Sequence, residues 1–121
     1  MTEVFVASVA ELEEHGRRLV RSGNLEIGVF LRDGQYYAYR NLCFHQGGPC
    51  TEGLLMAKVE EIIDTDGTYH GSRFNKDEMH FVCPWHGYEY VLKTGECAPD
   101  RKKKLQNYEV VTREGSVYVR V

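Results

Sequence analysis

Two short segments of the chain each place a cysteine close to a histidine, and these four residues are the ones best suited to chemistry. Cys43 and His45 stand two positions apart in "CFHQGGP", and Cys83 and His86 stand three apart in "CPWHGYEY". Thiolate sulfur and imidazole nitrogen are ligands for zinc and for iron-sulfur clusters. Together the two segments predict one metal site with two sulfur and two nitrogen ligands.

The order of the ligands along the chain distinguishes two kinds of metal site. A zinc site with two cysteines and two histidines usually takes its sulfurs from one segment and its nitrogens from the other. Here each segment supplies one of each, which suits a cluster of two unequal irons. Cys43 and Cys83 would bind one iron, and His45 and His86 the other. A structural zinc-binding module stays open, whereas a thiol enzyme using Cys83 with His86 would leave the first pair unexplained.

These motifs resemble those of the Rieske 2Fe-2S family, and the likeness spans nearly the whole chain. The segments "TEGLL", "KTGE" and "LQNYEVVTREGSVYV" also match the pattern of its ferredoxin-like members. The chain is similar to the ferredoxin components of bacterial ring-hydroxylating oxygenases. The resemblance implies one 2Fe-2S cluster per chain, bound by Cys43, His45, Cys83 and His86.

Several positions around these ligands are expected to support the cluster. Glycines let the backbone approach and donate N–H groups to the sulfides, and prolines stiffen the loops. These positions are Gly47, Gly48, Pro49, Pro84, Trp85, Gly87, Tyr88 and Pro99, the last in a covering third loop. Where the respiratory type has a bridging cysteine pair and a sulfide-donating serine, this chain has other residues. The resemblance therefore implies a reduction potential toward the low end of the Rieske range, about −150 mV.

The other cysteines and histidines are expected to be structural. Cys50 reads as a buried thiol near the cluster, and a disulfide between Cys50 and Cys97 is disfavoured in a reducing compartment. His15, His70 and His80 are expected at the surface or half-buried, with His80 facing outward.

Alternating apolar residues and closely spaced turn signals predict an all-β fold. We expect hairpins at Asp33-Gly34 and Glu114-Gly115, and a short helix that begins at Ser8 with a capping box and ends at Gly16. The resemblance implies an antiparallel sandwich or small barrels, with a cluster-binding subdomain of two loops and an extended insertion between them.

A length of 121 residues predicts a single domain over residues 1–121. Its cluster-binding part would cover about 41–100, with a surface insertion at about 55–79. "AKVEEIID" in that insertion fits a strand or a helix turn, and the polar segment after it is expected to be rich in turns. The insertion is either a tolerated extended hairpin or an element that docks a partner.

A net charge of −3 argues against a nucleic-acid-binding surface. No apolar stretch is long enough to span a membrane and no export signal is visible, so we expect a cytoplasmic protein without a membrane partner. The cationic run "RKKK", residues 101–104, reads as a solvated loop, with a docking patch for an acidic partner as the alternative.

Taken with the resemblance, these features indicate an electron-transfer component that is not catalytic alone. It would pass single electrons from a flavoprotein or ferredoxin reductase to a terminal oxygenase. The alternative is a small Rieske subunit of a nitrite-reductase-like complex.

Overall fold

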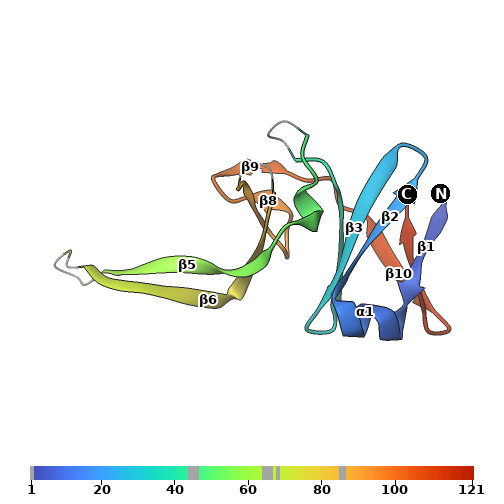
Figure 1. The fold of residues 1–121 in the computed structure, drawn as a ribbon, viewed down its shortest axis with the longest axis horizontal. Helices are drawn as coiled ribbons and strands as arrows, with labels where there is room; N and C mark the ends of the chain where they lie inside the picture. The colour runs from blue at the N-terminus through green and yellow to red at the C-terminus, as the bar shows by residue number, and fades with distance from the viewer. Residues whose placement is uncertain (1, 44–46, 64–66, 68, 85–86) are drawn as a thin grey trace.

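Eleven β-strands, one short α-helix and one 3-10 helix make up the fold over residues 2–43, 47–63, 67, 69–84 and 87–121, which the computed structural model describes. The strands pair into three antiparallel sheets of three, three and five strands. The two smaller sheets form a base that carries both chain ends, and the larger sheet extends from its side (Figure 1). The predicted all-β antiparallel class is confirmed, although the sheets stay open and none closes into a barrel among the described residues.

The base is held together by an apolar core between its two sheets. One sheet has the order β1 (Glu3–Ser8), β11 (Ser116–Arg120) and β10 (Glu109–Arg113), and the other the order β2 (Arg17–Ser22), β3 (Leu25–Arg32) and β4 (Gln35–Arg40). The buried core residues are Val6, Ala7, Leu12, Val20, Ile27, Val29, Ala38, Val117 and Val119. Burying each of the larger side chains contributes roughly 1.5–3 kcal/mol, which offsets the cost of ordering the chain.

The helix α1 (Val9–His15) begins and ends as its sequence predicts. The hydroxyl of Ser8 accepts the N–H of Glu11, and the Glu11 carboxylate accepts in return from the Ser8 backbone, so the capping box is complete. Gly16 ends the helix in the left-handed conformation, at φ 78°. His15 lies in the last turn with its side chain 62% exposed, which confirms its expected surface position.

Both predicted hairpins of the base are present. Asp33 and Gly34 join β3 to β4, and Glu114 and Gly115 join β10 to β11. All four residues have positive φ, the combination that a tight two-residue turn between twisted strands requires. The local sequence therefore determines the register of these two pairs.

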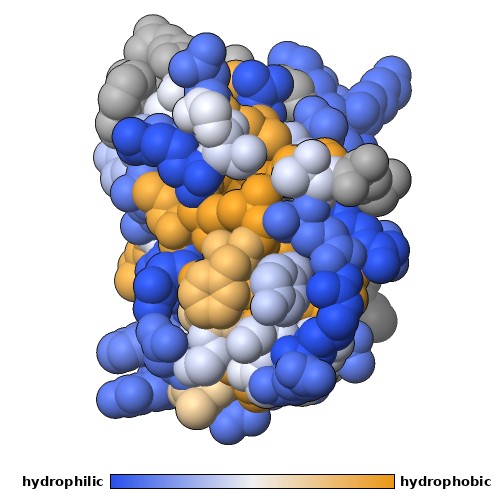
Figure 2. Space-filling model, turned by 90° about the vertical axis from the view of Figure 1, so that its right-hand side faces the viewer, coloured by the Kyte–Doolittle hydropathy of each residue, from blue (hydrophilic) through white to orange (hydrophobic). Residues whose placement is uncertain are grey.

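The outer face of the β1–β11–β10 sheet has an apolar centre, visible in Figure 2 as a patch ringed by hydrophilic side chains. Phe5 is 55% exposed and lies edge-on against Tyr118, with ring centroids 5.9 Å apart. The Arg113 guanidinium lies over the Tyr118 ring, and Glu3 accepts hydrogen bonds from both Arg113 and Arg120. The charges that border this patch are therefore neutralised in pairs.

The third sheet leads into the predicted metal site. In spatial order its strands are β5 (Leu55–Ile63), β6 (Tyr69–Val82), β7 (Glu89–Val91), β8 (Glu96–Cys97) and β9 (Asp100–Lys104). The run at 101–104, expected as a solvated loop, is instead part of the edge strand β9, although all its side chains are exposed as expected.

The outer parts of β5 and β6 form a long hairpin that projects away from the rest of the molecule (Figure 1). Their register runs from Leu55 opposite Phe81 to Ile63 opposite Tyr69. The described part of "AKVEEIID", residues 57–63, is thus a strand. The expectation of a turn-rich segment before Met79 was wrong, because residues 69–78 belong to β6. A two-stranded hairpin is held by backbone pairing along its length, so a polar composition does not prevent it.

No helix within the described ranges has the length and apolar character needed to cross a membrane.

Candidate metal centre

The first cysteine motif lies in loop 1 (residues 43–48), whose ends are tied by two backbone hydrogen bonds. The amide of Cys43 donates to the carbonyl oxygen of Gly48 at 2.8 Å, and the amide of Gly47 donates back to the carbonyl of Cys43 at 3.1 Å. Gly47 has φ 68°, a conformation that residues with a Cβ adopt only at a cost.

The second motif lies in loop 2 (residues 83–88), which repeats this frame. The amide of Cys83 donates to the carbonyl of Tyr88 at 2.8 Å, and the amide of Gly87 donates to the carbonyl of Cys83 at 3.0 Å. Gly87 has φ 73°. The two cysteines therefore occupy equivalent positions in two loops closed by the same two backbone hydrogen bonds, which explains why both motifs contain a glycine four residues after the cysteine.

Both cysteines are buried in one cluster of apolar side chains. Cys43 is 3% exposed and Cys83 is 1% exposed, and neither forms a disulfide. The hydroxyl of Tyr90, on β7, lies 3.0 Å from the sulfur of Cys43. When Cys43 is a thiolate, the hydroxyl must be the donor, so Tyr90 stabilises negative charge on that sulfur.

Aromatic rings connect these cysteines to the base. Phe81 stacks on Phe30 with ring centroids 5.1 Å apart, and Tyr90 stacks on Phe81 at 5.5 Å. Tyr39 packs on the same ring, and its hydroxyl donates to the carbonyl of Leu92 at 2.6 Å. The ring of Tyr90 is therefore held by stacking on Phe81 while its hydroxyl lies beside Cys43.

A buried amide side chain fixes the segment that follows loop 1. The Oδ1 atom of Asn41 accepts from the amide and the hydroxyl of Thr51, at 2.9 and 2.7 Å. Its Nδ2 atom donates to the Glu52 carboxylate at 3.0 Å. These bonds hold the 3-10 helix η1 (Cys50–Glu52) against the start of loop 1. Asn41 was not among the predicted site residues.

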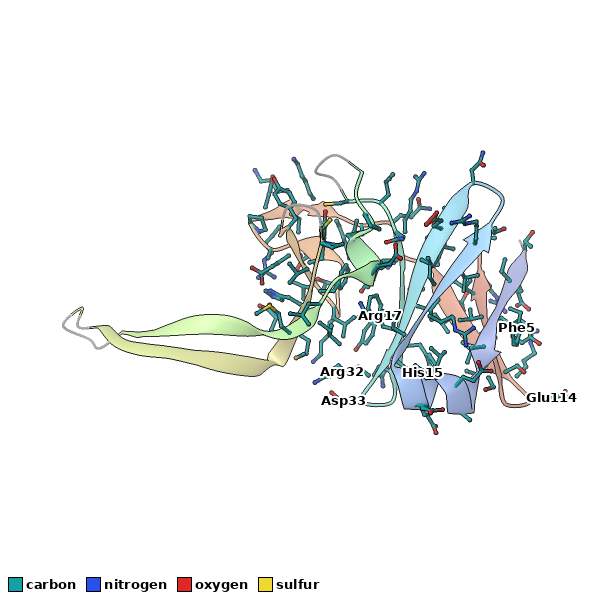
Figure 3. The ribbon with its side chains drawn as sticks, viewed as in Figure 1. Phe5, His15, Arg17, Arg32, Asp33 and Glu114 are labelled. Carbon is teal, nitrogen blue, oxygen red and sulfur yellow. The ribbon has the colours of Figure 1, made fainter. Side chains whose placement is uncertain are left out.

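Arg17 joins this segment to the base (Figure 3). From β2, its guanidinium donates to the carbonyls of Thr51, at 3.0 Å, and Gly53. The same group lies over the Phe30 ring, 5.7 Å from its centroid. One side chain thus links the base sheet, the aromatic stack and the end of η1.

The predicted supporting positions divide into buried and exposed ones. Gly48 is buried, Pro49 and Tyr88 are half-buried, and Pro84 and Pro99 are exposed. The carbonyl of Gly48 also accepts from the amide of Cys50 at 2.9 Å. Three predicted residues, His45, Trp85 and His86, lie outside the described part of the chain. The structure therefore brings the two predicted sulfur ligands together, and the histidine ligands stay a prediction.

Residues 2–109 match the family model described as the Rieske [2Fe-2S] domain. The chain belongs to this family. Its cofactor is accordingly a 2Fe-2S cluster.

Relatives and solved structures agree with this Rieske assignment. The chain is 28% identical to the 3-phenylpropionate/cinnamic acid dioxygenase ferredoxin subunit of Photorhabdus laumondii, over 100% of this chain and 96% of that subunit. Its fold is similar to a protein assigned as the small subunit of an NADPH nitrite reductase, with a TM-score of 0.68, 16% identity and full coverage of both chains. It is also similar to a chain in the complex of reduced oxygenase and oxidized ferredoxin in carbazole 1,9a-dioxygenase, with a TM-score of 0.67, 24% identity and coverage of 97% and 91%.

The described residues fit the Rieske cluster. Two buried cysteines outside any disulfide stand at equivalent positions, a hydroxyl lies beside one sulfur, and a glycine four residues after each cysteine closes the loop. Thiolates are the sulfur ligands that iron-sulfur clusters require. No group of three or more described His, Cys, Asp and Glu side chains could hold a further metal ion, so Cys50 and Cys97 do not form a second site with the other two cysteines.

Cys50 and Cys97 are buried, as expected for Cys50, and neither forms a disulfide. Burial, with the nearby charges of Cys43 and Cys83, raises the pKa of the Cys50 thiol to about 12. Burial also raises the pKa of Cys97. Both therefore stay protonated and unreactive at neutral pH.

The expectation for His80 was wrong, since its side chain is only 4% exposed. Its Nδ1 atom lies 3.0 Å from the Glu89 carboxylate and its Nε2 atom lies 3.0 Å from the Glu78 carboxylate. Glu78 in turn accepts from Arg101. The ring is buried because two polar partners satisfy both nitrogens. The side chain of His70 lies outside the described part of the structure.

Proposed function

We propose that this protein is a one-electron carrier that passes electrons from a flavoprotein or ferredoxin reductase to a terminal oxygenase. The observation that carries the proposal is the pair of matching loops with one buried cysteine each. When bound, a Rieske cluster supplies a single reversible electron step. The dioxygenase ferredoxin subunit that matches over the full chain supports the choice of an oxygenase system.

In this proposal the four motif residues divide between the two irons. Cys43 and Cys83 bind one iron, and His45 and His86 bind the other. Loop N–H groups outside the closing backbone bonds would donate to the cluster, and Tyr90 would donate to the sulfur of Cys43. Donors that stabilise added negative charge favour the reduced state, so the loops bind the cofactor and tune its potential.

The protein would be an electron-transfer component without a reaction of its own. Cys43 and Cys83 act as ligands, and the thiols of Cys50 and Cys97 are held protonated by burial. We also propose that it acts in the cytoplasm, where cysteines stay out of disulfides, as the four cysteines here do. We further propose that the chain is a single domain. Its cluster-binding part covers about 41–100, with an insertion at about 55–79.

A second candidate function is favoured by one observation. The fold matches the nitrite reductase small-subunit protein over the full length of both chains. A subunit of such a complex would co-purify in fixed ratio with a large reductase subunit from its native cell. A shuttle would instead purify alone.

Cofactor analysis tests the proposal. Anaerobically purified protein should contain two irons and two acid-labile sulfides per chain, with the electron paramagnetic resonance signal of mixed histidine and cysteine ligation after reduction. His45→Cys and His86→Cys should each shift that signal. Zinc without sulfide would overturn the proposal in favour of a structural zinc module.

A further inference from the structure

The edge strand β9 carries a concentration of positive charge that the proposed electron step does not explain. Arg101, Lys102, Lys103 and Lys104 follow one another on this strand, and all are exposed. The chain as a whole has a net charge of −3. The strand therefore departs from the overall charge of the protein.

The lysines of β9 differ from several arginines of the described chain in having no carboxylate partner. Arg101 is neutralised by Glu78 at 3.3 Å and Glu96 at 3.5 Å. By contrast, Lys102, Lys103 and Lys104 form no ion pair with any other described residue. Arginines of the base do have carboxylate partners, namely Arg18 with Glu11, Arg21 with Glu26, and Arg113 and Arg120 with Glu3. The charge on β9 is therefore available to another molecule.

This strand lies next to loop 1. A surface hollow reaches the buried Cys43 from outside and is lined by Arg40, Leu42, Cys43, Gly47, Lys104, Leu105 and Gln106. Arg40 and Lys104 add two cations to its lining, and Leu42, 43% exposed, adds an apolar surface. Figure 1 shows β9 away from both the chain ends and the projecting hairpin.

We propose that β9 and this hollow dock an acidic protein surface, that of the electron-transfer partner. The proposal rests on the proposed function, since docking beside Cys43 matters only if electrons pass there. Unpaired cations attract an acidic surface over about 10 Å at moderate salt, which speeds encounter and orients it. Carboxylates beside Arg40 and Lys104, with contacts to Leu42, would then hold the partner against loop 1.

Lysines on an edge strand have another use, because they discourage edge-to-edge pairing between copies. The two roles predict different results. Steering predicts a change in electron-transfer rate that depends on the charge of the partner. Edge protection predicts self-association once the lysines are removed.

Two redox proteins of opposite charge serve as probes, namely acidic plastocyanin and basic cytochrome c. In each reaction one electron leaves the dithionite-reduced protein and reduces Cu(II) or ferric haem. The test variant combines Lys102→Gln, Lys103→Gln and Lys104→Gln. The control combines Arg18→Gln, Arg21→Gln and Lys93→Gln, which changes the net charge equally on other surfaces.

At low ionic strength the test variant should reduce plastocyanin about tenfold more slowly than the wild type does, and the control variant should match the wild type. Added salt should slow the wild-type reaction with plastocyanin. The inference is overturned if both variants reduce plastocyanin equally slowly, or if the rate of the test variant is unchanged. It is also overturned if the test variant self-associates in gel filtration while its monomer reacts at the wild-type rate. A protein that lacks a cluster, or reduces neither probe, would instead contradict the proposed function.

Discussion

Loops 1 and 2 share one backbone frame but differ in what holds them. In each, the cysteine amide and a glycine four residues later close the loop. Loop 1 continues into η1, which Asn41 fixes through buried side-chain bonds. Loop 2 is the connection between β6 and β7, so strand pairing holds it on both sides. The motif therefore encodes the two closing hydrogen bonds of each loop, whereas each loop obtains its rigidity from different surroundings.

The largest effect on cluster binding is expected from the two cysteines, which occupy equivalent positions in the two loops. Cys43→Ser and Cys83→Ser should each abolish cluster binding, because each removes a thiolate ligand. Iron and sulfide content and visible absorption would measure the loss. Cys50→Ala is the matched control and should keep the cluster, because Cys50 is buried outside the two ligand motifs. Loss of the cluster in Cys50→Ala but not in Cys83→Ser would contradict the ligand assignment.

The difference between the loops should appear in Asn41→Ala. This change leaves the buried Thr51 groups without their acceptor, at a cost of about 2 kcal/mol in the free energy of unfolding measured in urea. Hydrogen exchange should rise at the amide of Thr51 but not at that of Gly87. Asn24→Ala, in an exposed turn, is the control. Equal acceleration at both amides would show that the loops share one source of rigidity.

Gly47→Ala and Gly87→Ala test the shared frame. Each places a Cβ at positive φ, which costs about 1–2 kcal/mol, and Gly47 would also bring its Cβ 3.4 Å from Leu42. Cluster retention during incubation with a chelator should fall in both variants. Gly23→Ala, at φ 60° in the base, carries similar strain and should leave retention unchanged. If Gly23→Ala lost the cluster as fast, general instability would explain all three.

The smallest effect is expected when the hydrogen-bond donor that β7 supplies to loop 1, the Tyr90 hydroxyl, is removed. Tyr90→Phe removes the hydroxyl 3.0 Å from the Cys43 sulfur, so the reduced cluster loses about 1 kcal/mol of relative stabilisation. The midpoint potential should fall by about 40 mV in a redox titration. Tyr39→Phe, whose hydroxyl donates to a carbonyl instead, should leave the potential unchanged. A potential that rises in Tyr90→Phe would contradict the direction of this bond.

Features decided by neighbouring residues could be predicted from the sequence. The capping box at Ser8 and Glu11 and the turns at Asp33-Gly34 and Glu114-Gly115 depend on a few consecutive side chains, and all are present. The cysteine motifs likewise predicted the family, because the spacing of ligands within a loop is local.

Features decided by distant partners could not be predicted in this way. Tyr90 meets Cys43 across 47 positions, and no spacing rule indicates that meeting. The alternation of apolar and polar residues predicted that His80 faces outward. Its side chain is buried instead, because the carboxylates of Glu78 and Glu89 satisfy both ring nitrogens. An extended hairpin was one of the two predicted readings of the insertion, but its second strand was expected to be rich in turns, because backbone pairing and not an apolar face defines β6.

The pairing of β1 with β11 has a consequence for biosynthesis. The amide of Thr2 donates to Val121 and the amide of Val121 donates to Thr2, so the first strand is completed by the last one (Figure 1). During translation β1 cannot pair with β11 until β11 has left the ribosomal exit tunnel. The base therefore closes only after both cysteine loops have been translated.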